Sequence, residues 1–229
     1  CAAITENTMP SFKSAVLAAA VALPTLSFAD SAINYDYVQA SFAKSELDSP
    51  SSGEPEKTTA TVFELQKDLG YQVVASVSAG FVELKDRYET DEAKYGADVD
   101  QRTLRIAIDR YFQISPTLHI IPGLSYSETK SDVKTKFQRT DVNFFFEETF
   151  VTYTDSSAFN LETRYRLSEY SPLELSGTVS YATGEEEDSI IVDLSAELNI
   201  SDILSGRFSY QKDIENAAPA YVYGIRVYF

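Results

Sequence analysis

The chain ends on Tyr221-Val222-Tyr223-Gly224-Ile225-Arg226-Val227-Tyr228-Phe229, a stretch in which every odd position carries an aromatic or aliphatic side chain. Alternation of this kind places one set of side chains on each face of a β-strand. A soluble strand needs no apolar terminus, although an ordinary last strand that happens to end in Phe is the alternative. The stretch therefore predicts a final strand whose apolar face meets something other than water.

Upstream of this stretch, back to residue 30, the same period-two alternation recurs in segments of about ten residues. This length suits a strand that crosses a bilayer at a tilt. The expected strands are Ile33 to Ala43, Ala60 to Leu69, Gln72 to Leu84, Gln101 to Phe112, Leu118 to Thr129, Ala158 to Leu167, Leu173 to Thr183, Ser189 to Ile200, Leu204 to Lys212 and Ala220 to Phe229. The predicted fold is all-β, an antiparallel up-and-down transmembrane β-barrel of about ten strands, with eight or twelve as alternatives.

The connections between these segments alternate between short and long. Short turns are expected at Asp68 to Tyr71, Gln113 to Thr117, Ser168 to Pro172 and Asn199 to Ile203. Longer links are expected at Lys44 to Thr59, Lys85 to Asp100, Lys130 to Ser157, Gly184 to Asp188 and Asp213 to Pro219. In outer-membrane barrels the short turns face the periplasm and the long links face the exterior. Both termini are then periplasmic, and the acidic external links are solvated loops, because no fixed spacing of carboxylates indicates a metal site.

The distribution of charge between the two faces decides what the apolar face meets. Leu104, Ile106 and Ile108 share one face of their segment, while Arg105 and Asp109 share the other. A soluble barrel of the lipocalin type would show the same alternation with its apolar face inside. A lipid-facing barrel instead encloses its charges, which should then balance in sign, because unpaired interior charge is costly.

The residues assigned to the interior are Arg105, Arg164, Arg166, Arg207 and Arg226 against Glu64, Asp109, Glu162, Glu174, Asp193 and Glu197. This set is nearly balanced, although the whole chain carries a net charge of −16. The contrast favours a lumen lined by ion pairs. The acidic total also disfavours nucleic acid as a partner, since phosphate binding needs a basic face.

Near its start the chain has the three parts of a secretory leader. Lys13 precedes the apolar run Ala15 to Leu23, and small residues stand at Ser27 and Ala29. We expect a signal peptide over residues 9–29, a mature barrel over residues 30–229, and an upstream segment over residues 1–8 that is not part of the protein. A short buried helix is the alternative for the apolar run.

Together with this leader, the last nine residues resemble the C-terminal strand of bacterial outer-membrane proteins. The resemblance implies a small barrel of the OmpA-like, OmpX-like and porin-like group, in the outer membrane of a Gram-negative cell. It also implies a monomer whose partners are outer-membrane lipid, lipopolysaccharide, the barrel-assembly machinery and periplasmic chaperones. The residues that would form the assembly signal are Tyr221, Tyr223, Ile225, Val227 and Phe229.

An enzyme is the least expected function. Outer-membrane hydrolases rely on a histidine placed with Ser or Asp near the outer rim or outer wall, whereas the single histidine, His119, lies beside the predicted periplasmic turn Gln113 to Thr117. We expect a satisfied lumen histidine, with Asp109 as a possible partner. The sequence contains no Ser-His-Asp, metal-ligand or phosphate-loop pattern, so no catalytic residue, metal or cofactor is predicted.

The remaining hypotheses are a narrow porin-like channel or envelope-stabilising surface protein and, as an alternative, a ligand-binding or adhesion barrel that uses its external loops. The Lys130 to Ser157 link is unusually apolar for an external loop. It could constrict the barrel mouth, bind an apolar ligand, extend the sheet above the membrane or supply two more membrane strands. Aromatic residues expected in interfacial girdles are Tyr35, Tyr37, Phe42, Phe81, Tyr111, Phe112, Tyr126, Tyr181 and Tyr210.

Overall fold

The computed structural model describes residues 33–47, 56–89, 93–139, 144–184, 188–214 and 219–229. The predicted signal peptide and several of the acidic link residues lie outside these ranges. None of the described residues forms a helix long and apolar enough to cross a membrane. The strands are β1 Tyr37–Leu47, β2 Glu56–Gly70, β3 Val73–Glu89, β4 Ala93–Arg110, β5 Phe112–Ser115, β6 Leu118–Arg139, β7 Phe144–Arg166, β8 Leu173–Gly184, β9 Ser189–Ser201, β10 Leu204–Asp213 and β11 Ala220–Tyr228.

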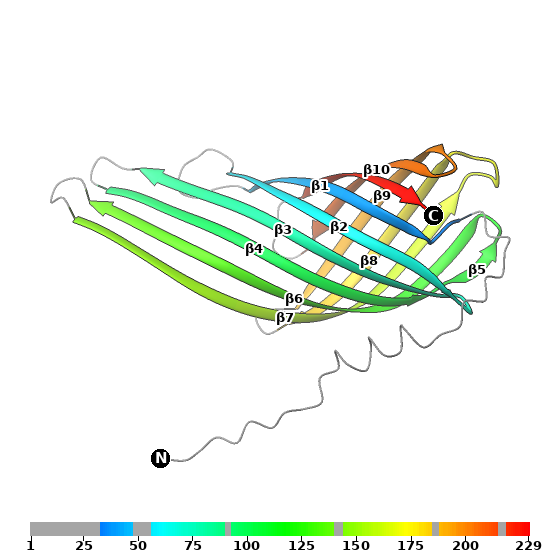
Figure 1. Cartoon of the computed structure of the whole chain (residues 1–229), viewed down its shortest axis with the longest axis horizontal. Helices are drawn as coiled ribbons and strands as arrows, with labels where there is room; N and C mark the ends of the chain where they lie inside the picture. The colour runs from blue at the N-terminus through cyan, green and yellow to red at the C-terminus, as the bar shows by residue number, and fades with distance from the viewer. Residues whose placement is uncertain (1–32, 48–55, 90–92, 140–143, 185–187, 215–218) are drawn as a thin grey trace, which may run out of the picture.

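The strands form one closed antiparallel barrel (Figure 1). Except for β4 and β5, each strand pairs with its neighbour along the chain, and β1 closes the ring on β11 through pairs such as Tyr37↔Tyr228. β4 and β5 are two parts of one wall strand, interrupted at Tyr111, because both pair with β6. The barrel therefore has ten strands, which confirms the predicted fold class and count.

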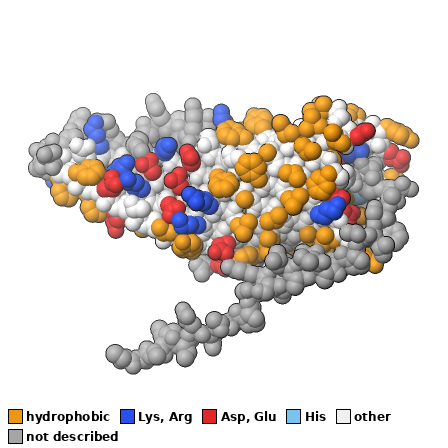
Figure 2. Space-filling view, viewed as in Figure 1, with side chains coloured by type: hydrophobic (Ala, Val, Ile, Leu, Met, Phe, Trp, Pro, Cys, Tyr) orange, Lys and Arg blue, Asp and Glu red, His pale blue; other side chains and the backbone are white. Residues whose placement is uncertain are grey.

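The outer surface of the barrel carries an apolar band near the short turns. Leu104 is 56 % exposed and Leu124 is 60 % exposed, although both lie in the middle of long, well-paired strands. Other exposed residues of this band are Val38, Phe63, Leu65, Val77, Phe159, Leu161, Val179, Leu194, Phe208, Tyr223 and Ile225. On the face drawn in Figure 2, apolar side chains gather over the half of the molecule near the short turns, and most charged side chains lie over the other half. A closed barrel with such a band is the β-structure that spans membranes.

Four strands continue far beyond the apolar band. β3, β4, β6 and β7 have 17, 18, 22 and 23 residues, whereas about ten suffice to cross a bilayer. The predicted loops Lys85 to Asp100 and Lys130 to Ser157 are therefore largely strand, and Figure 1 shows these strands projecting at the end opposite the short turns. The link Lys130 to Ser157 extends the sheet, and the expectation that it adds two membrane strands is wrong.

Two smaller boundaries also differ from expectation. β1 begins at Tyr37 rather than Ile33, because the chain before Tyr37 turns into the barrel end. The predicted turn Gln113 to Thr117 is mostly strand β5, which pairs with β6 up to Ser115↔Leu118. The tight turn is thus confined to residues 116 and 117.

Closure of the barrel predicts heat-modifiable electrophoretic mobility. The ring of β1–β11 pairs leaves no open edge inside the membrane, so SDS alone should not unfold it. Unboiled and boiled samples should run at different apparent masses on an SDS gel. Identical mobility of the two samples, taken from isolated outer membranes, would contradict a closed barrel.

Candidate functional site in the barrel lumen

The lumen collects the charged residues that the alternation assigned to it. Arg164, Glu174, Glu197 and Arg226 are each less than 5 % exposed. A cavity inside the barrel is lined by six more of them: Glu64, Arg105, Asp109, Glu162, Asp193 and Arg207. Arg166 completes the set, because its guanidinium lies 3.4 Å from the buried Glu174 carboxylate.

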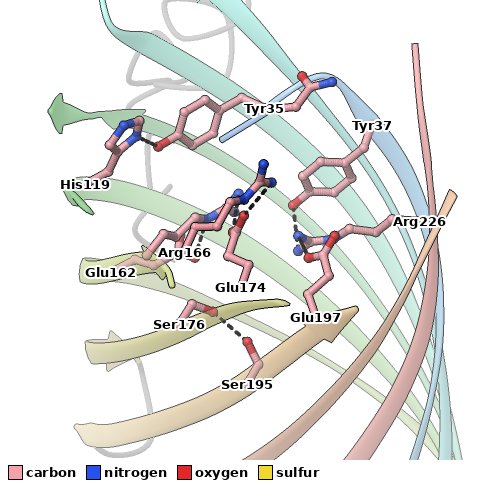
Figure 3. A network of polar contacts seen from close by, with 12 residues as sticks. Tyr35, Tyr37, His119, Glu162, Arg166, Glu174, Ser176, Ser195, Glu197 and Arg226 are labelled. Carbon is pink, nitrogen blue, oxygen red and sulfur yellow. Dashed lines mark hydrogen bonds and ion pairs between the residues drawn. The ribbon is translucent and has the colours of Figure 1, made fainter. Parts of the chain in front are cut away.

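Arg226 on β11 is the centre of the most buried group of polar contacts. Its guanidinium is ion-paired with Glu197 on β9, donates to the Gln39 side chain, and lies 4.0 Å above the Tyr37 ring. Glu197 also accepts hydrogen bonds from Ser205, at 2.5 Å, and from Tyr228. This group, drawn in Figure 3, therefore ties β11 to β1, β9 and β10 at the barrel seam.

A second group connects β7 to β8. The Nε of Arg164 donates to Glu162 at 2.7 Å, and the Nη1 of Arg164 lies 4.0 Å from Glu174. Glu174 also pairs with Arg166 at 3.4 Å. Two cations and two carboxylates thus neutralise one another where water is largely excluded, as a buried charge requires.

The remaining interior charges are less tightly paired. Arg207 lies 3.5 Å from Asp193, and the Tyr37 hydroxyl donates to Glu64 at 2.7 Å. Arg105 donates to the Asn160 side chain at 3.3 Å and forms no ion pair with any residue in the described ranges. The balanced charge count therefore does not mean that every interior charge has an ionic partner.

Asp109 explains a glycine on the neighbouring strand. It packs over Gly123, where any Cβ atom would collide with the Asp109 carboxylate. A side chain at position 123 would therefore force the Asp109 carboxylate to move.

An aromatic and aliphatic layer lies in the lumen at the short-turn end, against β3 and β6. Its buried residues are Ile33, Tyr35, Val74, Tyr111 and Ile121, with His119 fully buried beside them. The Tyr35 ring stacks on Tyr111 at 4.7 Å, and its hydroxyl is hydrogen-bonded to Nδ1 of His119 at 2.6 Å (Figure 3). Arg164 lies 5.0 Å above the other side of the Tyr35 ring, which joins this layer to the ion pairs.

Above this layer the lumen is hollow. A cavity of about 320 Å³ extends from Ile121 and Gln66 near the layer to Ala43, Ala60 and Gln211 on the far side of the ion pairs. Its wall is mainly polar and includes most of the interior charges. The lumen is therefore a polar cavity with a packed floor rather than a continuous wide pore.

Sequence reasoning missed this floor. Tyr35, Tyr37 and Tyr111 were expected in interfacial girdles, but they are 3 %, 1 % and 8 % exposed and lie inside the barrel. His119 is a lumen histidine, but its hydrogen-bond partner is Tyr35 and not Asp109. One local signal was present, because the odd positions of this segment change from apolar, at Ile33 and Tyr35, to polar, at Gln39 and Ser41.

No group of three or more His, Cys, Asp or Glu side chains within the described ranges is placed to hold a metal ion. His119 is fully buried, and its ring stacks beside those of Tyr111 and Tyr35 at 5.5 and 5.9 Å. This packing is typical of a structural histidine. The five residues of the predicted assembly signal all point outward and are exposed: Tyr221, Tyr223, Ile225, Val227 and Phe229. Their role in assembly stays a prediction.

No family model and no curated protein matches the chain. Solved barrels are similar in outline. An outer-membrane channel from Pseudomonas putida F1 is 10 % identical, with a TM-score of 0.46, over 90 % of this chain and 100 % of that chain. The KdgM porin is 8 % identical, with a TM-score of 0.43, over 83 % of this chain and 99 % of that chain. The outer-membrane protease OmpT from Escherichia coli is 11 % identical, with a TM-score of 0.43, over 85 % and 94 %.

Channels and a protease thus occur together among the similar barrels, and the function has to be argued from the lumen of this chain. Its ten-strand ring, apolar band and charged interior give it the architecture of an outer-membrane β-barrel, as the sequence predicted.

Proposed function

We propose that the protein is an outer-membrane barrel that works as a narrow porin-like channel, closed at rest by the layer at its short-turn end. The observation that carries this proposal is the polar cavity of about 320 Å³ that is bordered by Ile121, a member of the buried layer that contains Tyr35. A barrel only slightly wider than eight strands has little interior space to spare, so a few side chains can close it. The resting protein then passes few ions, and only small ones.

The segment that carries Tyr35 lies outside the strands of the wall. Ile33 and Tyr35 precede β1, and Asp36 beside them contacts β2 through its ion pair with Lys67 at 2.5 Å. A segment held in this way can leave without breaking the β-sheet. This makes it a suitable gate.

Planar-bilayer recording tests the gate. The wild-type barrel should show small or rare conductance steps, because the floor blocks the cavity. Replacing Tyr35 and Tyr111 together with alanine should give larger and more frequent steps, since two rings of the floor are removed. As a control, Tyr165→Ala changes an exposed, outward-facing tyrosine of β7 and should leave conductance unchanged. Large, steady, weakly selective steps in the wild type would contradict a closed channel.

A binding or adhesion role is the second candidate, and the long strands β6 and β7 favour it. They reach well beyond the apolar band, which a channel alone does not require. Outer-membrane lipid, lipopolysaccharide, the barrel-assembly machinery and periplasmic chaperones are the partners that we propose for insertion and maintenance, with the barrel as a monomer. Neither candidate makes the protein an enzyme.

A further inference from the structure

The upper part of β7 has an open edge. Residues Phe144 to Asp155 pair with β6 on one side, in continuous register from Arg139↔Phe144 to Glu128↔Asp155. On its other side β7 first pairs with β8 at Ser156↔Gly184. No strand within the described residues covers the edge above that point, and in Figure 1 β7 forms the border of the projecting sheet.

The protection of this edge consists of carboxylates alone, at Glu147, Glu148 and Asp155. Proteins normally blunt exposed edges with charged side chains, above all lysine, and with proline or bulges, because free N–H and C=O groups at strand spacing recruit another strand. Residues 144–155 contain no Lys, Arg or Pro, and their pairing with β6 has no register shift. Every residue from Phe144 to Tyr153 is exposed, including Phe145 at 60 % and Tyr153 at 63 %.

On β4 and β6 the two faces of the projecting sheet have the opposite polarity to the barrel below, whereas β7 keeps Phe145, Val151 and Tyr153 on the outer face. The face continuous with the outer surface carries ion pairs such as Lys134–Glu147 at 2.7 Å. The face continuous with the lumen carries Tyr95, Phe137 and Phe146, which line an apolar hollow of about 280 Å³. An apolar sheet face of this kind is a surface for packing against another molecule.

The charge of the edge restricts what can bind it. Glu148 lies on the lumen-side face between Phe146 and Phe150, and it forms no ion pair with any described residue. The chain as a whole carries −16. A basic side chain flanked by apolar ones would match this sequence of aromatic, acidic and aromatic residues.

A second copy of the chain fits less well. Two barrels in one membrane are related by a twofold axis along the membrane normal, so their β7 edges would have to pair in parallel. Both copies would also bring the same acidic edge into contact. A backbone is still the expected occupant, because only an extended polypeptide matches a row of amide donors and acceptors.

We propose that the edge of β7 from Phe144 to Asp155 binds an extended, basic segment of a partner protein as an added strand. The segment places Lys or Arg opposite Glu148 and apolar side chains on either side of it, over the lumen-side face. Added in this way, it covers both the open edge and part of the apolar face. This binding does not depend on whether the lumen conducts.

A labelled peptide tests the proposal on the whole barrel in lipid nanodiscs. The probe is Val-Thr-Lys-Thr-Val-Thr-Lys-Thr-Val, which places Val and Lys on one face, and its dissociation constant is measured by fluorescence anisotropy. A twin with Glu in place of Lys, and a twin with alternate amides N-methylated, should each bind about tenfold more weakly. These twins remove the charge match and the backbone hydrogen bonds, respectively.

Two variants of equal charge change locate the site. Glu148→Lys should weaken binding of the basic peptide about tenfold and strengthen binding of the acidic twin. Glu169→Lys, in the turn at the other end of the barrel, should change either constant by less than about twofold. Heat-modifiable mobility shows that both variants are folded.

Several results would overturn the proposal. They are no measurable binding of the basic peptide, equal binding of the N-methylated twin, or equal effects of Glu148→Lys and Glu169→Lys. Energy transfer between differently labelled barrels, lost in Glu148→Lys, would show that a second copy occupies the edge instead.

Discussion

Replacing Arg226 with alanine is expected to lower the free energy of unfolding by about 3–5 kcal/mol, because it leaves a buried carboxylate without its cation. Glu197 is 4 % exposed, and Arg226 is its only ion-pair partner within the described ranges. Gln39 and Tyr37 lose contacts at the same time. Urea unfolding of the refolded barrel in lipid vesicles, followed by far-ultraviolet circular dichroism, measures this change.

The double variant separates the lost ion pair from the lost packing. If the uncompensated charge dominates, Arg226→Ala together with Glu197→Ala should be less destabilised than the sum of the single changes, by about 1 kcal/mol or more. Arg102→Ala, on the exposed outer face, should change stability by about 0.5 kcal/mol or less. A similar loss at Arg102 and Arg226 would show that the seam contacts carry no special weight.

The faces of the wall strands could be predicted from sequence because their cause is local. Leu104 and Ile106 meet lipid while Arg105 meets the lumen, and this contrast repeats every two residues wherever a strand crosses the membrane. The turn at residues 202 and 203 was also located within its predicted range, because polar turn residues interrupt the alternation there. Fold class and strand count follow from these local patterns.

The projecting sheet could not be predicted because its polarity is reversed. Above the apolar band, Lys130 and Lys134 occupy positions that face lipid lower down, while Val133 and Phe137 occupy the lumen-side positions. A membrane strand is expected to end where charged residues occupy its lipid-facing positions. The sequence therefore predicted a loop for these residues. The strands nevertheless continue, because alternation of polar and apolar residues favours β-structure whichever face carries the apolar ones.

The floor of the lumen was missed for a different reason. Tyr35 and His119 are separated by 84 residues along the chain, and nothing local indicates that they meet. Tyrosines near predicted strand ends fit an interfacial girdle and an interior layer equally well. Only the three-dimensional closure of β1 on β11 places the chain before Tyr37 inside the barrel.

Removing both arginines of the β7–β8 group should open the lumen and change its selectivity. In Arg164→Ala with Arg166→Ala, Glu174 loses both cations and Glu162 loses the Arg164 pair, so carboxylates line the passage without compensation. The Tyr35 ring also loses the guanidinium that lies 5.0 Å above it. We expect larger conductance steps, a reversal potential shifted toward that of the cation in a salt gradient, and a loss of about 3–5 kcal/mol in unfolding free energy.

The matched control keeps the positive charge at both positions but replaces each guanidinium with an ammonium group, which has fewer hydrogen-bond donors. Arg164→Lys with Arg166→Lys should retain most of the wild-type selectivity, because the net charge of the lumen is unchanged, while losing some stability with the guanidinium contacts. If the interior charges set the ion selectivity, the double alanine variant and the double lysine variant must differ in reversal potential. If they share the wild-type value, or if the alanine variant favours anions, the charges around Glu162 and Glu174 do not control the passage of ions.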